Sequence, residues 1–147
     1  PCPPECPSEV MTFDANAFEL EPGRWAVGFI AAVPVPDGPS RYSAPVSCSS
    51  TPTTGGEFVV RFEPPADGFY AIRSFALGGA DSVDTVAWVQ DSDCSPTAAA
   101  AACNDDSEFG GLVSSFRARF EAGNVVFVIV DGLPGDGATY SLLIESR

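Results

Sequence analysis

The chain contains no histidine and no lysine. Without histidine there is no Ser-His-Asp or Cys-His arrangement, and without lysine there is no Ser-Lys pair and no Schiff base. A carboxylate pair of the glycosidase type remains, but among 20 acidic residues some two will always lie at a suitable separation. No glycine-rich phosphate loop follows a strand pattern and opens a helix. These absences predict a protein that is not an enzyme.

Positive charge is also scarce, since seven arginines stand against 20 acidic residues and the formal net charge is -13. A field of that sign repels the phosphates of nucleic acids and anionic lipid surfaces. The longest apolar stretch, residues 26–35, ends in prolines and falls well short of the roughly 20 residues that span a bilayer. We therefore expect no nucleic-acid partner and no transmembrane segment.

Long helical patterns are missing, and the alanine run 98–102 is too short for a stable helix. Short apolar runs separated by 14 glycines and 14 prolines are typical of strands joined by tight turns. Seven such runs cover residues 24–33, 57–62, 69–77, 85–90, 113–120, 125–130 and 138–145. Their spacing predicts an all-β fold, a single antiparallel β-sandwich of about seven to nine strands. The short connection 64–68 predicts that 57–62 and 69–77 are antiparallel neighbours.

One domain is expected, because 147 residues suffice for one core and are few for two. Residues 1–9 contain four prolines, which exclude a helix interior. We interpret 1–9 as a Pro/Cys-rich linker or N-terminal arm and 10–147 as the sandwich domain.

Five cysteines in so short a chain favour an oxidising compartment, so we expect a secreted or bacterial cell-surface location. Cys94 and Cys103 flank eight residues at the two ends of one loop. A disulfide between them would contribute about 2 to 3 kcal/mol. Cys48 is expected to pair with Cys2 or Cys6, which leaves one thiol free, buried or bonded to another chain.

Acidic and amide side chains gather at strand ends and in loops. They are Asp81, Asp84, Asp91, Asp93, Asn104, Asp105, Asp106, Asp131 and Asp136. Alternate loops of a sandwich meet at one end, where several oxygens could bind calcium, the usual extracellular dication. The alternative is a solvated acidic rim, in which Asp and Asn cap turns through bonds to nearby backbone N–H groups.

Aromatic side chains are the last candidates for a site. Trp25, Tyr42, Phe69, Tyr70 and Trp88 could form a surface that stacks on a sugar or peptide. Aromatic residues in strands are more often part of the core. We favour the core for this set.

A succession of short motifs resembles the bacterial pre-peptidase C-terminal domain family over about residues 56–146. The motifs are residues 62–70, Asp84-Thr85-Val86, Cys94, Cys103-Asn104-Asp105-Asp106, Ala122-Gly123, residues 128–132 and residues 137–142. The resemblance implies a jelly-roll-like β-sandwich that accompanies secreted proteases and surface proteins. It also implies a binding, solubilising or secretion-linked module rather than an enzyme.

Two functions follow as hypotheses. The first is a non-catalytic secreted or cell-surface adhesion module, stabilised by calcium, that binds an extracellular protein or polysaccharide. The second is a structural subunit that joins copies of itself into a surface fibre, by strand addition or by an intermolecular disulfide.

Overall fold

The computed structural model describes residues 11–12, 18–21, 24–34, 48, 57–77, 85–90, 102–104, 114–132 and 139–146. The surroundings of side chains are described for residues 48, 57, 59–74, 85–90, 103–104, 114–131 and 141–146. The predicted N-terminal arm, residues 1–9, lies outside this set.

The described residues form strands and no helix. The strands are β1 (Met11–Thr12), β2 (Phe18–Glu21), β3 (Arg24–Pro34), β4 (Phe58–Phe62), β5 (Gly68–Leu77), β6 (Thr85–Gln90), β7 (Ala102–Asn104), β8 (Ser114–Phe120), β9 (Val126–Gly132) and β10 (Thr139–Ser146). Seven of them have five residues or more: β3, β4, β5, β6, β8, β9 and β10.

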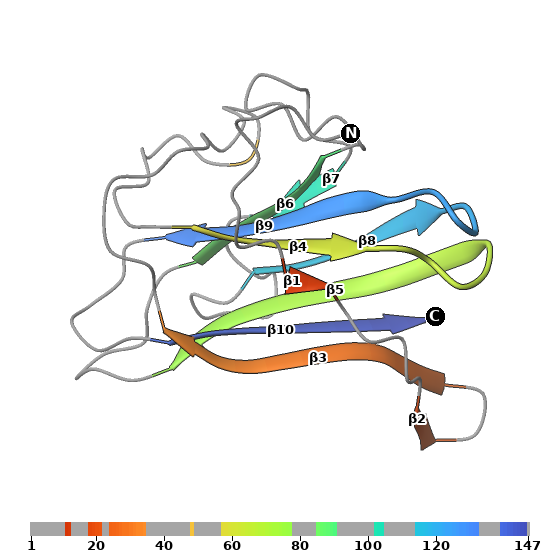
Figure 1. The fold of residues 1–147 in the computed structure, drawn as a ribbon, viewed down its shortest axis with the longest axis horizontal. Helices are drawn as coiled ribbons and strands as arrows, with labels where there is room; N and C mark the ends of the chain where they lie inside the picture. Colours follow the sequence, from red (N-terminus) through yellow and green to blue (C-terminus); the bar gives the residue numbers. More distant parts are fainter. Residues whose placement is uncertain are drawn as a thin grey trace.

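The strands build two five-stranded sheets (Figure 1). The first sheet has the order β1-β4-β9-β6-β7, and the second has the order β2-β3-β10-β5-β8. Strand β3 pairs with β10, β4 with β9, β5 with β8 and β6 with β7, all antiparallel. These four pairs have the pattern of one long hairpin, in which β3 to β6 run out and β7 to β10 return. Successive pairs lie alternately in the two sheets. This is the order of a jelly roll, so the predicted all-β, jelly-roll-like sandwich is confirmed.

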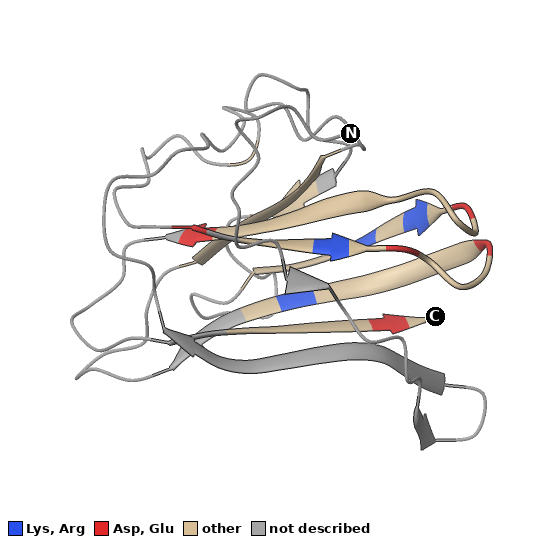
Figure 2. Ribbon diagram, viewed as in Figure 1, with Lys and Arg blue, Asp and Glu red and all other residues tan. Residues whose placement is uncertain are grey.

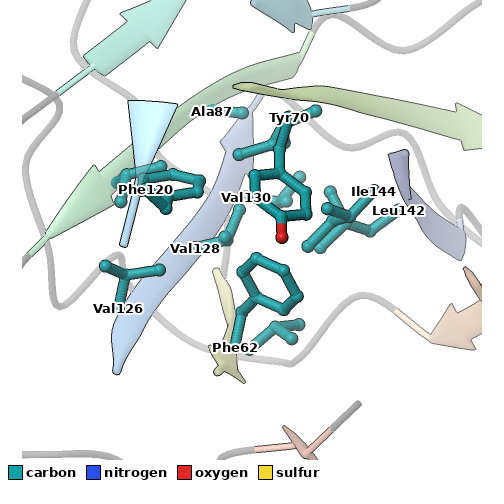
Figure 3. Packing of buried hydrophobic residues seen from close by; sticks show 12 residues of the cluster. Phe62, Tyr70, Ala87, Phe120, Val126, Val128, Val130, Leu142 and Ile144 are labelled. Carbon is teal, nitrogen blue, oxygen red and sulfur yellow. The ribbon is translucent and has the colours of Figure 1, made fainter. Parts of the chain in front are cut away.

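Alternating side chains from both sheets fill the space between them. Val128 and Val130 of β9 meet Leu142 and Ile144 of β10, and all four are fully buried (Figure 3). An aromatic group, Phe62, Tyr70 and Phe120, fills one part of this interior, with ring centroids 5.5 to 6.1 Å apart. The Tyr70 hydroxyl donates a hydrogen bond of 2.6 Å to the Ala66 carbonyl, which satisfies its polar atom.

The first sheet is also buried on its outer face. The apolar side chains there are Val59, Val86, Trp88, Phe127 and Ile129, packed with Cys48, Cys103 and Val125. As a result every residue of β6 is buried. A strand covered on both faces has a nearly continuous apolar sequence, as residues 86–89 of β6 do.

Hydroxyl groups join the two sheets at the start of β6 and β8. Thr85 Oγ1 lies 3.3 Å from Ser74 Oγ on β5 and 3.1 Å from Ser114 Oγ on β8. The Ser114 N–H donates to Thr85 Oγ1 at 3.2 Å, and the Ser114 hydroxyl donates to the Thr85 carbonyl. All three residues are buried, so these bonds satisfy groups that water does not reach.

Two turns connect the two sheets, residues 63–67 between β4 and β5 and residues 121–125 between β8 and β9. Hydrogen bonds join these turns to each other. Gly123 N–H donates to the Pro64 carbonyl at 3.0 Å, and Ala122 N–H donates to Asp67 Oδ1 at 2.7 Å. Gly123 has φ of 76°, the left-handed conformation that favours glycine at this position of a turn. Asn124 N–H donates to the Glu121 carbonyl at 3.1 Å and closes the turn over residues 121–124.

The seven predicted strands coincide with the seven longer strands, but one predicted pairing is wrong. Strands β4 and β5 are not neighbours, because β4 pairs with β9 and β5 pairs with β10 and β8. Their connection, Pro64 to Asp67, carries the chain from one sheet to the other. The short strands β1, β2 and β7 were not predicted, since two to four residues are too few for a visible period.

The hydroxyl group of Thr85 is expected to hold the sheets together. Thr85→Val keeps the volume but removes the oxygen bonded to the Ser74 hydroxyl and the Ser114 N–H, which should lower the free energy of unfolding by about 1 to 3 kcal/mol. Urea unfolding measures this change. The control is Ser115→Ala, which removes a half-buried hydroxyl with no hydrogen bond in the described residues and should change stability by less than about 0.5 kcal/mol. Equal effects of both variants would contradict the role of Thr85.

Candidate binding surface

Strands β5 and β8 present a basic surface on the outer side of the second sheet. Tyr70 and Ile72 point into the core, so their neighbours along β5 must point outward. The same alternation applies along β8, where Phe116, Ala118 and Phe120 pack on the core. We call the resulting surface the arginine face; its residues are Phe69, Ala71, Arg73, Ser115, Arg117 and Arg119.

The register places the charged residues of this face side by side. Arg119 lies opposite Phe69, Arg117 opposite Ala71, and Arg73 opposite Ser115. Directly opposite residues on one face have Cβ atoms about 5 Å apart, and diagonal ones about 7 to 8 Å. Arg73, Arg117 and Arg119 therefore form one continuous group.

Phe69 and Arg117 stack on each other. The guanidinium carbon of Arg117 lies 4.3 Å from the centroid of the Phe69 ring. Phe69 is 43% exposed, although a phenylalanine on a strand is usually buried. The stacking contact holds the guanidinium in place while its N–H groups remain able to donate.

The three arginines have no acidic partner within the described part of the chain. Arg61 on β4, in contrast, pairs with Glu63 at 3.6 Å. Figure 2 shows basic residues along β4, β5 and β8, while the described acidic residues lie in turns and near strand ends. Three unpaired like charges on neighbouring positions repel each other, and a bound anion would relieve this repulsion.

The structure describes two residues of the predicted acidic site, Asn104 and Asp131, and they lie on opposite faces of the first sheet. Asn104 lies opposite Ala87, which faces the interior, and Asn104 Oδ1 accepts a bond of 3.0 Å from Ser115 N–H. Asp131 lies opposite Val86, on the outer face of the same sheet, and is fully buried. Among the described residues no three His, Cys, Asp or Glu side chains form a group able to hold a metal ion.

The other predicted oxygen ligands lie outside the described residues. They are Asp81, Asp84, Asp91, Asp93, Asp105, Asp106 and Asp136. Calcium binding by these loops therefore stays a prediction.

The predicted disulfide pairing is wrong, because Cys103 pairs with Cys48 and not with Cys94. Cys103 lies on β7 opposite Trp88, so its side chain is on the outer face of the first sheet, where Cys48 also packs. The two Cα atoms are 5.8 Å apart, within the usual range for a disulfide. The same bond excludes the expected pairing of Cys48 with Cys2 or Cys6, and Cys2, Cys6 and Cys94 lie outside the described residues.

The aromatic candidates divide between core and surface. Trp88 and Tyr70 are buried, as predicted, whereas Phe69 is exposed. The side chain of Trp25 and the whole of Tyr42 are outside the described set. Sequence reasoning did not select Arg73, Arg117 or Arg119, although Arg117-Ala118-Arg119 is a visible signal of one basic strand face in an acidic chain.

Comparison with family models, with curated proteins and with solved structures found no match. The resemblance to the pre-peptidase C-terminal family therefore stays a prediction. No helix among the described residues is long and apolar enough to cross a membrane.

The Cys48–Cys103 bond can be tested by peptide mapping. Trypsin cuts after arginine, so under non-reducing conditions the peptide 42–61 should be linked to the peptide 74–117. Cys103→Ser should release 42–61, and Cys94→Ser should leave it linked. The reverse result would assign Cys48 to Cys94, and a parent chain in which 42–61 is not linked to 74–117 would contradict the Cys48–Cys103 bond. The bond closes 55 residues of chain, so its loss should destabilise the protein by about 4 kcal/mol in the chain-entropy model.

Proposed function

We propose that the chain is a non-catalytic binding module of a secreted or cell-surface bacterial protein, and that it binds an anionic ligand through the arginine face. The observation that carries this proposal is the group of three unpaired arginines beside the exposed ring of Phe69. Arginine is suited to this role because its planar fork matches the geometry of a carboxylate. The resemblance to the pre-peptidase C-terminal family favours the same class of function.

The energetics favour a ligand with several charges. One exposed arginine–carboxylate pair contributes only about 0.2 to 1 kcal/mol. Three arginines on one face can bind three acidic groups of one ligand, which adds these small terms at a single cost of association. Such binding is weakened by salt, because the charges are exposed and screened within about 8 Å at physiological ionic strength.

The net charge of the whole chain limits the choice of anion. At -13, the molecule repels a uniformly charged polymer such as nucleic acid at long range. A ligand with a short acidic stretch avoids most of this repulsion. An extracellular protein or a polysaccharide with local carboxylates fits best.

One observation favours the alternative, a structural subunit of a fibre. Strand β1 has only two residues and pairs parallel with β4, where Met11 lies opposite Val60 and Thr12 opposite Arg61. Because β1 is at the edge of the first sheet, the same pairing could be made by the N-terminal segment of another copy. Assembly of the purified chain into ladders or filaments would favour this alternative.

Binding of acidic polymers tests the proposed function. The probes are poly-L-glutamate and polygalacturonate, measured by isothermal titration at low ionic strength, with neutral dextran as a blank. The double variant Arg117→Gln/Arg119→Gln should bind at least about tenfold more weakly than the parent chain, a loss of about 1.4 kcal/mol. The polymers should also bind more weakly as salt is added.

Arg61→Gln is the matched control, since it removes one positive charge from the other sheet. It should bind as the parent chain does. If all variants bind equally, or if neither polymer binds, the arginine face is not a binding surface.

Calcium binding by the acidic loops is a separate proposal, supported by the excess of 13 negative charges. Calcium at about 100 times its dissociation constant would stabilise the fold by about 2.7 kcal/mol. Thermal unfolding in EDTA and in calcium measures this, and the rise should be lost in Asp105→Ala/Asp106→Ala. Identical curves would make these aspartates ordinary turn residues.

A further inference from the structure

Strand β8 is the last strand of the second sheet among the described strands. Its residues 115–119 are all partly accessible to solvent, and Arg117 and Arg119 are exposed. An edge strand leaves every second N–H and C=O without a partner strand and can pair with an extended chain.

The hydrogen bond of Ser115 indicates which residues face the open side. Its N–H donates to Asn104 Oδ1 on β7, and so points away from β5. In an antiparallel strand, residues two apart direct their backbone groups to the same side. The backbone N–H and C=O groups of Arg117 and Arg119 therefore point away from β5, toward the open edge of the sheet. Their guanidinium groups lie close to this edge, on the outer face.

We propose that an extended acidic segment of a partner protein adds to β8 as a further, antiparallel strand at Arg117 and Arg119. This inference rests on the proposed function and specifies its ligand. Residues directly opposite each other share a face, so alternate side chains of the added strand lie beside the arginines. Acidic residues at those positions repeat about every 6.7 Å, as Arg117 and Arg119 do.

The other side of the added strand meets a different surface. Phe116 and Ala118 pack on the core but are only partly buried. Apolar side chains would cover them. The added segment should therefore alternate acidic and apolar residues.

The open backbone favours a peptide over a polysaccharide, since only a peptide can pair with a strand edge along its length. A second copy of this chain is disfavoured, because it brings a further net charge of -13. A partner that is acidic only over the added segment does not bring this additional repulsion.

The test uses a short peptide of alternating glutamate and valine, with a second peptide of the same composition in two blocks, both measured by titration against the full chain. The alternating peptide should bind at least about tenfold more tightly. Methylation of the backbone nitrogens of the glutamates should weaken binding at least about tenfold, because their N–H groups face β8. The glutamate carboxylates are unchanged in this peptide and stay beside the arginines. Methyl groups on the valine nitrogens, which face away, should have little effect. Arg117→Gln/Arg119→Gln should reduce binding of the alternating peptide, and Arg61→Gln should not.

The failures are distinguishable. If the alternating, block and methylated peptides bind equally well, the arginine face binds anions but adds no strand, and only this inference is overturned. If polygalacturonate binds and the peptides do not, the ligand is a polysaccharide. If no acidic probe binds, the proposed function falls as well. A dimer of the free chain that is abolished by Arg117→Gln/Arg119→Gln would assign the edge to a second copy and overturn the partner proposed here.

Discussion

Side chains along β5 and β8 alternate strictly between the interior and the outer face of the second sheet. The residues held in the core therefore determine which residues lie on the surface. Because Tyr70 and Ile72 are held in the core, Phe69 and Arg73 must point outward, and the register with β8 then places Arg117 and Arg119 beside them. A slip of one residue would bury charged side chains and expose apolar ones, at a cost far above the stability of a small domain. The core thus determines the arrangement of the arginine face.

Polar contacts between the sheets hold the edge strand β8 in position. The hydroxyl of Thr85 joins its first residue, Ser114, to the first sheet, and the side chain of Asn104 binds the next residue, Ser115. The Cys48–Cys103 bond in turn attaches β7, the strand that carries Asn104, to another part of the chain. These bonds satisfy the start of the β8 edge and leave the part with Arg117 and Arg119 open, which is the part proposed to bind.

The sequence predicts local features of this fold well. Strand β6 has the predicted bounds because Thr85–Gln90 is a buried run between turn residues. Sheet partners are not local: β4 and β5 adjoin in sequence but lie in different sheets, since the same turn can close a hairpin or cross the sandwich. The Cys48–Cys103 bond depends on the unpredicted strand β7, and the arginine face depends on the register of β5 with β8, which no single strand reveals. Asn104 and Asp131 lie on opposite faces of the first sheet, because a strand places residues of opposite parity on opposite faces.

The arginine face is a local positive patch on a chain whose net charge is -13. We propose that the open edge of β8 orients an acidic segment along this patch. Native-state amide hydrogen exchange of the free protein, followed residue by residue by NMR, tests this most directly. The N–H groups of Phe116 and Ala118, bonded to β5, should be protected to about the global stability, whereas those of Arg117 and Arg119 should exchange rapidly. Protection of all four amides would show that the edge is already covered and would contradict the proposed site.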